Sequence, residues 1–137
     1  MINIEAIKPQ DIQQKWPVIE PFVSKALEYS LNEHNSEDLK KKMINGEYLL
    51  LGFYEGDKIL SIVSAELLTY PRKKIVNIVT AAGSSMEKWL DEWWRAIKIL
   101  AKEQGAQEIT VSGRSGWLKA LKKYGFKQQY TVLAVKL

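Results

Sequence analysis

Residues 75–105, IVNIVTAAGSSMEKWLDEWWRAIKILAKEQG, contain a β-branched run, a turn of small residues and a long amphipathic segment in succession. Residues 75–79 have the composition of a buried strand. From residue 86 onward, apolar side chains recur every three or four positions and charged side chains fill the positions between them, which predicts a helix closed by Gly105. Trp93 and Ile97 lie at the centre of the apolar stripe, so we expect both to be buried against a sheet.

The predicted turn at residues 80–85 indicates an anion site. Gly83 and its small neighbours precede a helix N-terminus, where free backbone N–H groups and the helix dipole favour a phosphate or pyrophosphate. The same residues also fit a capping box, in which Ser84 and Glu87 satisfy those N–H groups themselves. The sequence leaves both interpretations open.

Length and composition restrict the class of protein. A chain of 137 residues with 46% hydrophobic residues fits a single domain, residues 1–137. The absence of cysteine excludes disulfides, thiolate metal sites and cysteine nucleophiles, and the single histidine, His34, does not suffice for a histidine metal site, so we expect no metal. The net charge of +4 comes without a nucleic-acid-binding motif, so nucleic acid is not an expected partner.

The start of the chain and its longest apolar run bear on location. The first residues, MINIE, lack the basic and apolar regions of a signal peptide. The longest apolar block, around residues 48–54, is far shorter than the roughly 20 residues of a membrane span. We therefore expect a cytoplasmic protein with no membrane partner.

Periodicity and turn residues predict the remaining elements. The chain alternates between strand-like and helix-like patterns, with Pro17 and Pro21 tolerable only near the start of the first helix and Ser36 as the cap of the second. The predicted order is a strand at 2–7, helices at 16–31 and 37–45, strands at 48–54, 58–70 and 75–79, the long helix, a strand at 108–112, a helix at 117–124 and a strand at 130–135. This order predicts an α/β fold with a mixed, mostly antiparallel sheet flanked by helices.

Three quoted segments carry a resemblance to a known family. They are AGSSMEKWLDEWW at residues 82–94, GRSGW at 113–117 and WLKALKKYGF at 117–126. With the order of elements, they resemble the GCN5-related N-acetyltransferase (GNAT) fold over essentially the whole chain. They also look like small GNAT-like proteins encoded by tailed bacteriophages.

The resemblance implies a site for acetyl-CoA. The cofactor would lie in a V between the strand ending at Val79 and the strand ending at Ser112, with its pyrophosphate on the following loop. The usual loop motif of the family has two positions for small residues. This chain has a glycine, Gly83, at one of them and no glycine at the other. Arg114 is expected to bind a phosphate or carboxylate at the mouth of the cleft, or instead to stack on Trp117 or cap the next helix. The cofactor-binding candidates are Val79, Thr80, Ala81, Ala82, Gly83, Ser84, Ser85 and Arg114.

The catalytic positions of the family are only partly matched. The position of its frequent general-acid tyrosine is occupied by Leu121, and Tyr124, next to Gly125, is the remaining candidate. The family also has a frequent glutamate on the strand that leads into the loop. In this chain that strand, residues 75–79, contains Asn77 as its one polar residue. Glu66, on the neighbouring strand, is therefore the candidate proton acceptor, with a solvated strand position as the alternative.

Two functions follow from the resemblance. The first is an acyl-CoA N-acyltransferase of phage origin that binds acetyl-CoA and an amine acceptor, either a small molecule or a protein. The second is a non-catalytic, virion-associated or structural phage protein that keeps the fold and binds phage structural proteins. The corresponding locations are the host cytoplasm and the virion.

Overall fold

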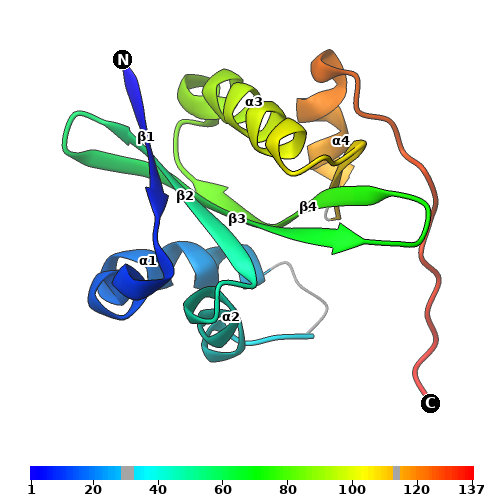
Figure 1. Ribbon diagram of the computed structural model, residues 1–137, viewed down its shortest axis with the longest axis horizontal. Helices are drawn as coiled ribbons and strands as arrows, with labels where there is room; N and C mark the ends of the chain where they lie inside the picture. Colours follow the sequence, from blue (N-terminus) through cyan, green and yellow to red (C-terminus); the bar gives the residue numbers. More distant parts are fainter. Residues whose placement is uncertain (29–32, 113–114) are drawn as a thin grey trace.

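A sheet of five strands separates two helical layers in the computed structural model, which describes residues 1–28, 33–112 and 115–137 (Figure 1). The strands lie side by side in chain order, antiparallel from the first to the fourth and parallel between the last two. They are β1 (Ile2–Ile7), β2 (Tyr48–Glu55), β3 (Lys58–Thr69), β4 (Lys74–Gly83) and β5 (Glu108–Val111).

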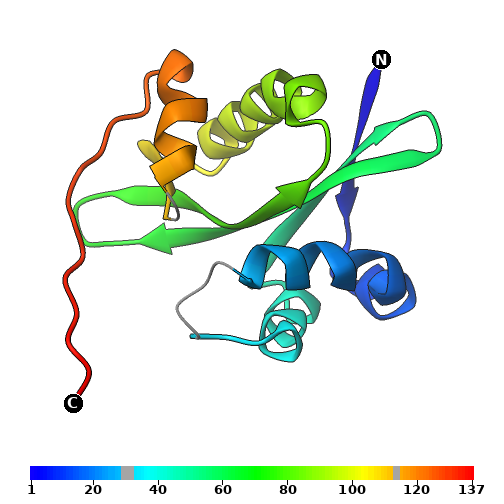
Figure 2. The ribbon, with the colours of Figure 1, turned by 180° about the vertical axis from the view of Figure 1, so that it is seen from behind.

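The helices cover both faces of the sheet. On one face lie α1 (Ile12–Leu27) and α2 (Ser36–Ile44), and on the other lie α3 (Met86–Glu103) and α4 (Ser115–Leu121), as the two opposite views show (Figures 1 and 2). Single 3-10 turns, η1 (Pro9–Asp11) and η2 (Lys122–Tyr124), extend two of them. Because β4 and β5 are parallel, α3 forms the crossover that joins them. The predicted α/β class with a mixed, mostly antiparallel sheet is confirmed.

Each helical layer has its own hydrophobic core. The core under α3 and α4 contains Trp89, Trp93 and Ile97, and the last two are 1% and 0% exposed, which confirms the prediction for the apolar stripe of the long helix. The core under α1 and α2 is mainly aliphatic and includes Ile19 and Leu39. We call these two sides the α3/α4 face and the α1/α2 face.

Two predictions for the N-terminal helices were wrong in detail. Helix α1 begins at Ile12, not residue 16, so Pro17 and Pro21 lie inside it. Both prolines are exposed and four residues apart, so the carbonyl groups that they leave without an N–H partner face water. The cap of α2 is Asn35, whose side chain accepts from the backbone N–H of Asp38 at 2.9 Å, rather than Ser36.

The predicted last strand at residues 130–135 is not formed. Residues 126–137 run as a tail that is exposed from residue 127 onward and has no strand partner in the part of the chain that the structure describes (Figure 1). Its β-branched composition is that of a strand, but strand pairing needs a neighbouring edge, and the tail runs past the end of β5. The structure of the tail therefore differs from the sequence expectation because pairing is a tertiary property.

Candidate functional site

Strand β4 is longer than the sequence indicates. Four of the expected loop residues, Thr80, Ala81, Ala82 and Gly83, belong to this strand and pair with β3, and only Ser84 and Ser85 separate it from α3. The prediction of a loop at 80–85 was therefore wrong for most of its length. Pairing with β3 overrides the turn preference of these small residues, and the hydroxyl of Ser61 reinforces it by donating to the carbonyl of Ala82 at 2.9 Å.

The ladder between β4 and β5 ends before β4 does, at the position where the family resemblance implies the V; we call this position the V. The parallel pairing stops at Ile78 opposite Val111, whereas β4 continues to Gly83 with β3 as its one strand partner within the described ranges. A bulge at Val79 marks the same point, because Ser64 pairs with Thr80 but Ala65 pairs with Ile78. Bulges bend a strand and commonly lie beside functional sites. The outer part of β4 thus presents a backbone edge to the space that β5 leaves.

Buried hydroxyl groups stabilise the bulge. Ser64 and Thr80, 0% and 6% exposed, bring their side-chain oxygens to 2.5 Å, and the backbone N–H of Thr80 donates to the Ser64 hydroxyl at 3.1 Å. This contact gives a hydrogen-bond partner to groups that would be costly to bury without one. The shape of β4 at the opening is therefore built into the core.

Four polar side chains cross the sheet in one line at the opening. Tyr48, Glu66, Asn77 and Thr110 are successive partners on β2, β3, β4 and β5, so they share one face; we call them the polar row. Tyr48 belongs to the core under α1 and α2, which places the polar row on the α1/α2 face. Asn77 and Thr110 lie one pair before the last pair of the β4–β5 ladder.

Hydrogen bonds orient Glu66 within the polar row. The Thr110 hydroxyl donates to Asn77 Oδ1 at 2.8 Å, and Asn77 Nδ2 donates to Glu66 Oε1 at 3.1 Å. These two hydrogen bonds fix the orientation of the Asn77 amide and hold the Glu66 carboxylate toward β4. Burial raises the pKa of Tyr48, and the charge of Glu66 across the strand raises it further. Glu66 is therefore a half-buried, oriented carboxylate rather than a fully solvated strand residue.

The start of α3 differs from the predicted capping box. The N-cap is Ser85, in the left-handed region with φ 53° and ψ 50°, and its side chain makes no capping hydrogen bond. The capping box of Ser84 and Glu87 is therefore wrong. A non-glycine residue in this conformation is uncommon and is a form of strain that clusters at functional sites. The Ser85 side chain therefore leaves the start of α3 uncapped, although the N–H of Lys88 donates to the carbonyl of Ser85 at 2.8 Å, and an uncapped helix N-terminus suits an anion.

A small pocket lies on the α1 side of this junction. Its volume is about 190 Å³, and Lys25, in the last turn of α1, lines it together with Ser84. Sequence reasoning missed Lys25, because no local pattern indicates that the end of α1 packs beside the end of β4. A larger pocket of about 290 Å³ lies elsewhere, against β1 and the β2–β3 hairpin, and has mostly aliphatic walls. The complete lining of the smaller pocket is Pro21, Phe22, Lys25, Gly83 and Ser84.

Gly83 has a steric role against β3. A Cβ at this position would lie 2.2 Å from the carbonyl oxygen of Leu60 and 2.8 Å from the Cα of Ser61. Its φ is not positive, so the glycine is needed for close approach of two strands rather than for an unusual conformation. The N–H of Ser84 then donates to the same Leu60 carbonyl at 2.9 Å. The structural requirement for glycine here therefore comes from β3.

Tyr124 lies apart from Glu66. Its hydroxyl donates to Asp91 on α3, and its ring packs on Trp94 with centroids 5.4 Å apart, on the α3/α4 face. Burial and the hydrogen bond to Asp91 raise the pKa of Tyr124 to about 12. Leu121, at the position of the family tyrosine, is 2% exposed within the same core. The structure therefore does not bring the two predicted catalytic residues together.

Three further sequence expectations concern Arg114, a metal site and a membrane span. Arg114 lies outside the described residues. Within the described ranges, no group of three or more His, Asp or Glu side chains is arranged to hold a metal ion. Every helix of the described residues is too short or too polar to span a bilayer.

Solved structures with the same architecture provide the comparison. A protein described as a predicted acetyltransferase, with acetyl-CoA, from Clostridium acetobutylicum is 15% identical, with a TM-score of 0.74 over 99% of this chain and 96% of its own. An aminoglycoside acetyltransferase from an uncultured soil sample is 12% identical, with a TM-score of 0.73 over 100% and 99%. A GNAT-family acetyltransferase from Staphylococcus aureus is 14% identical, with a TM-score of 0.67 over 99% and 98%.

Sequence comparison adds nothing further, because no family model and no curated protein matches the chain. At 12–15% identity, the structural likeness concerns the fold. The fold is that of the GNAT acetyltransferases, as the resemblance implies. The same comparison gives no indication of a phage protein, since these three structures come from two bacteria and a soil sample.

Proposed function

We propose that this protein is an acyl-CoA N-acyltransferase that uses acetyl-CoA to acetylate a small-molecule amine. The observation that carries the proposal is the V at the end of the β4–β5 ladder, with the polar row at its opening. Strand β4 thus offers an open backbone edge. The uncapped N-terminus of α3 follows this strand, and the neighbouring strand β3 carries the oriented carboxylate of Glu66. These are the groups that binding of acetyl-CoA and deprotonation of an amine require.

The residues around the V fit acetyl-CoA. The outer edge of β4, Val79 to Gly83, offers backbone groups that can pair with amides of the pantetheine arm. The uncapped N–H groups at the start of α3 and the ammonium of Lys25 suit the pyrophosphate. When bound, acetyl-CoA supplies an acetyl group activated as a thioester. A cofactor-bound structure with the same fold supports this assignment.

Glu66 is the proposed proton acceptor. An amine must lose a proton to become an acetamide, and a positioned carboxylate can take that proton directly or through one water. Asn77 occupies Oε1 of Glu66, and the described residues provide no hydrogen-bond donor for Oε2. Oε2 is therefore the atom that would receive the proton. Backbone N–H groups of the outer part of β4 would stabilise negative charge on the thioester oxygen.

The acceptor class follows from the chemistry of the site and from the comparisons. The polar row offers a carboxylate, an amide and a hydroxyl, which suit a polar cationic amine. One neighbour is described as an aminoglycoside acetyltransferase, which supports a small-molecule acceptor. A protein amine and a phage origin remain predictions. A virion-associated, non-catalytic protein is the alternative outcome of the experiment below.

Acetyl-CoA titration followed by an acetylation assay tests the proposal. We expect acetyl-CoA binding by calorimetry and release of free CoA with a panel of polar amines. Glu66→Gln should lower the rate about 10²- to 10⁴-fold with unchanged cofactor affinity. Glu103→Gln, an exposed carboxylate at the end of α3, is the matched control and should keep full activity. Tyr124→Phe should also keep it, because the hydroxyl of Tyr124 is bound to Asp91 on the opposite face.

Each unexpected outcome has a clear meaning. Absence of acetyl-CoA binding would overturn the enzyme proposal and leave the non-catalytic alternative. Binding with full activity in Glu66→Gln would remove Glu66 as the proton acceptor. A rate loss confined to Tyr124→Phe would assign the proton transfer to the α3/α4 face instead.

A further inference from the structure

The C-terminal tail, residues 126–137, exposes an unusual amount of apolar surface. Five of its last eight side chains are large and apolar, and each of them is at least 75% exposed. Single exposed apolar residues are normal, but a contiguous set marks an interaction site. The five are Tyr130 (77%), Val132 (75%), Leu133 (89%), Val135 (83%) and Leu137 (119%).

Strand β5 has an open edge. It is the last strand in the sheet order, and among the described residues it pairs only with β4. An edge strand presents a row of unpaired N–H and C=O groups, which is a template for an additional strand. The chain thus contains an unpaired strand-like segment and an unpaired strand edge at the same end of the sheet.

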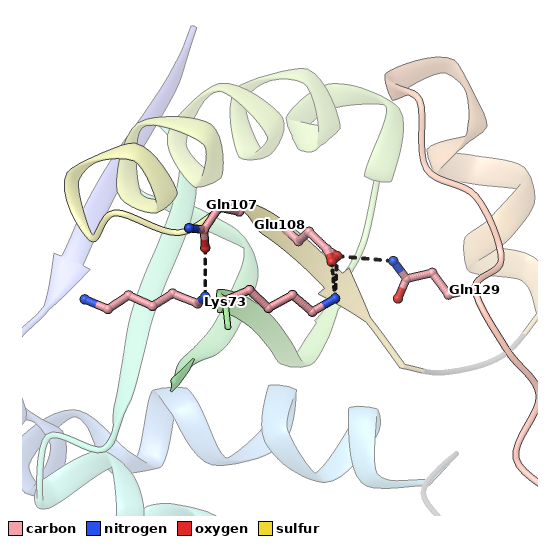
Figure 3. Close-up of polar contacts among 5 residues, drawn as sticks. Lys73, Gln107, Glu108 and Gln129 are labelled. Atoms are coloured by element: carbon pink, nitrogen blue, oxygen red, sulfur yellow. Dashed lines mark hydrogen bonds and ion pairs between the residues drawn. The ribbon is translucent and has the colours of Figure 1, made fainter. Parts of the chain in front are cut away.

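Contacts of Phe126 and Gln129 hold the first part of the tail in a position in which it does not pair with β5 of its own chain. Phe126 packs on Trp93 and Trp94, with ring centroids 6.4 and 5.4 Å apart, and Gln129 Nε2 donates to Glu108 Oε2 at 3.3 Å. Glu108 is the first residue of β5 (Figure 3). The tail therefore reaches that end of the strand at residue 129.

The last eight residues then continue beyond the sheet, away from β5 (Figures 1 and 2). Glu108 is itself held by Lys73 Nζ, at 2.6 and 3.2 Å from its two carboxylate oxygens, so the anchor of Gln129 is fixed (Figure 3). Residues 130–137 thus leave the sheet from a point that the contacts of Phe126 and Gln129 hold in place.

We propose that residues 130–137 of one copy pair with the outer edge of β5 in a second copy, and that the exchange is reciprocal. In a strand, Leu133, Val135 and Leu137 share one side. Ile109 and Val111 of β5 pack against the core of the α3/α4 face, so the three tail residues would extend that core. A reciprocal contact closes as a two-fold dimer and leaves no free edge.

The available area is sufficient for a dimer. Burying an aliphatic side chain removes roughly 100 Å² of apolar surface from water, so three on each of two tails give on the order of 600 Å², and the receiving surfaces contribute about as much again. Specific interfaces begin near about 1,000–1,200 Å² in total. A second copy is therefore an adequate partner.

Sedimentation and hydrogen exchange of the protein without any ligand test this proposal separately from the enzymatic one. We expect a dimer at micromolar concentration, with protected amides in both the tail and β5. Leu133→Asp/Val135→Asp should give a folded monomer and expose both segments. A chain ending at Gln129 should also be monomeric. Ile99→Asp, which changes an apolar residue of α3 that is 58% exposed, is the control and should remain dimeric.

Three results would overturn the proposal. A monomeric wild type with an unprotected tail would mean that the tail is free. A monomeric wild type with a protected tail would mean that the tail closes on its own chain. A dimer that survives both the double substitution and the truncation would mean that another surface forms the interface.

Discussion

The two faces of the sheet are built from the same strands but differ in the side chains that they carry. On the α3/α4 face, aromatic rings dominate: Phe53 packs on Trp89 with centroids 5.8 Å apart, and Trp93 and Trp94 continue the cluster. On the α1/α2 face, aliphatic side chains surround the polar row and the buried Ser64–Thr80 pair. Because side chains alternate along a strand, each face can be specified independently. Aromatic packing is therefore concentrated on one face, and hydrogen-bonded polar side chains on the other.

This difference has a physical reason. Polar groups near a core must be hydrogen-bonded, so a site built into a sheet needs several of them in register. The polar row meets that condition through cross-strand pairs on the α1/α2 face. The aromatic core of the α3/α4 face supplies apolar burial without such constraints.

The largest expected effect is on the aromatic face. Trp93→Ala should lower the free energy of unfolding by about 3–5 kcal/mol, because it leaves a cavity in the core. Trp93→Phe should cost much less, since the buried indole N–H has no hydrogen-bond partner among the described residues and its removal offsets part of the lost volume. Chemical denaturation measures both. A loss below about 1 kcal/mol for Trp93→Ala would contradict close packing of Trp93 in the core of this face.

The next effect is at the junction between β4 and α3. Gly83→Ala should cost about 3 kcal/mol, the upper part of the range for overpacking, because the new methyl group meets the backbone of Leu60 rather than a movable side chain. Gly116→Ala in α4 is the matched control: a Cβ there meets nothing within 4 Å, and the change should be neutral or stabilising. Equal effects of the two substitutions in urea denaturation would show that β3 does not require the glycine.

A smaller effect is expected from the buried hydroxyl pair on the α1/α2 face. Ser64→Ala should cost about 1–2 kcal/mol, because it leaves the N–H and hydroxyl of Thr80 without their partner. Adding Thr80→Val should recover part of that loss by removing the unpaired hydroxyl. The coupling from the double-mutant cycle measures the pair. Strict additivity would mean that the contact contributes nothing to the bulge.

Much of the fold could be predicted from local sequence. The 3.6-residue pattern identifies α3 and its buried residues, and turn signals identify the β2–β3 hairpin. Gly105, with φ 71°, takes the left-handed conformation expected where the long helix ends. These features depend on residues close together in the chain.

The site was less predictable because it depends on contacts between distant residues. Pairing with β3 draws residues 80–83 into β4, and register alone aligns Glu66 with Asn77 and Thr110. The position of Lys25 beside Ser84 results from packing of α1 on the sheet. The unpaired tail was unpredictable for the same reason. Its sequence is typical of a strand, but a strand forms only where a neighbouring edge is in position to pair with it.

The smallest effect separates the stabilising core of the α3/α4 face from the polar contact on its surface. Tyr124 donates to Asp91, whose side chain is 64% exposed, so solvent screens this contact and Tyr124→Phe should cost less at pH 7 than Ser64→Ala. The contact should nevertheless depend on pH. The pKa of Tyr124 is about 12 in the folded protein and near 10 when unfolded, so between these values the native state holds a proton that the unfolded state has lost.

Stability from Tyr124 is therefore complete below pH 10 and is lost as pH rises toward 12. Unfolding free energies of wild type and Tyr124→Phe, measured between pH 9 and about 11.5, should converge as pH increases. Tyr48 and Tyr54 also have raised pKa values, but they are present in both proteins, so the difference isolates Tyr124. Parallel curves would mean that burial and the hydrogen bond to Asp91 do not raise the pKa of Tyr124 in the folded protein.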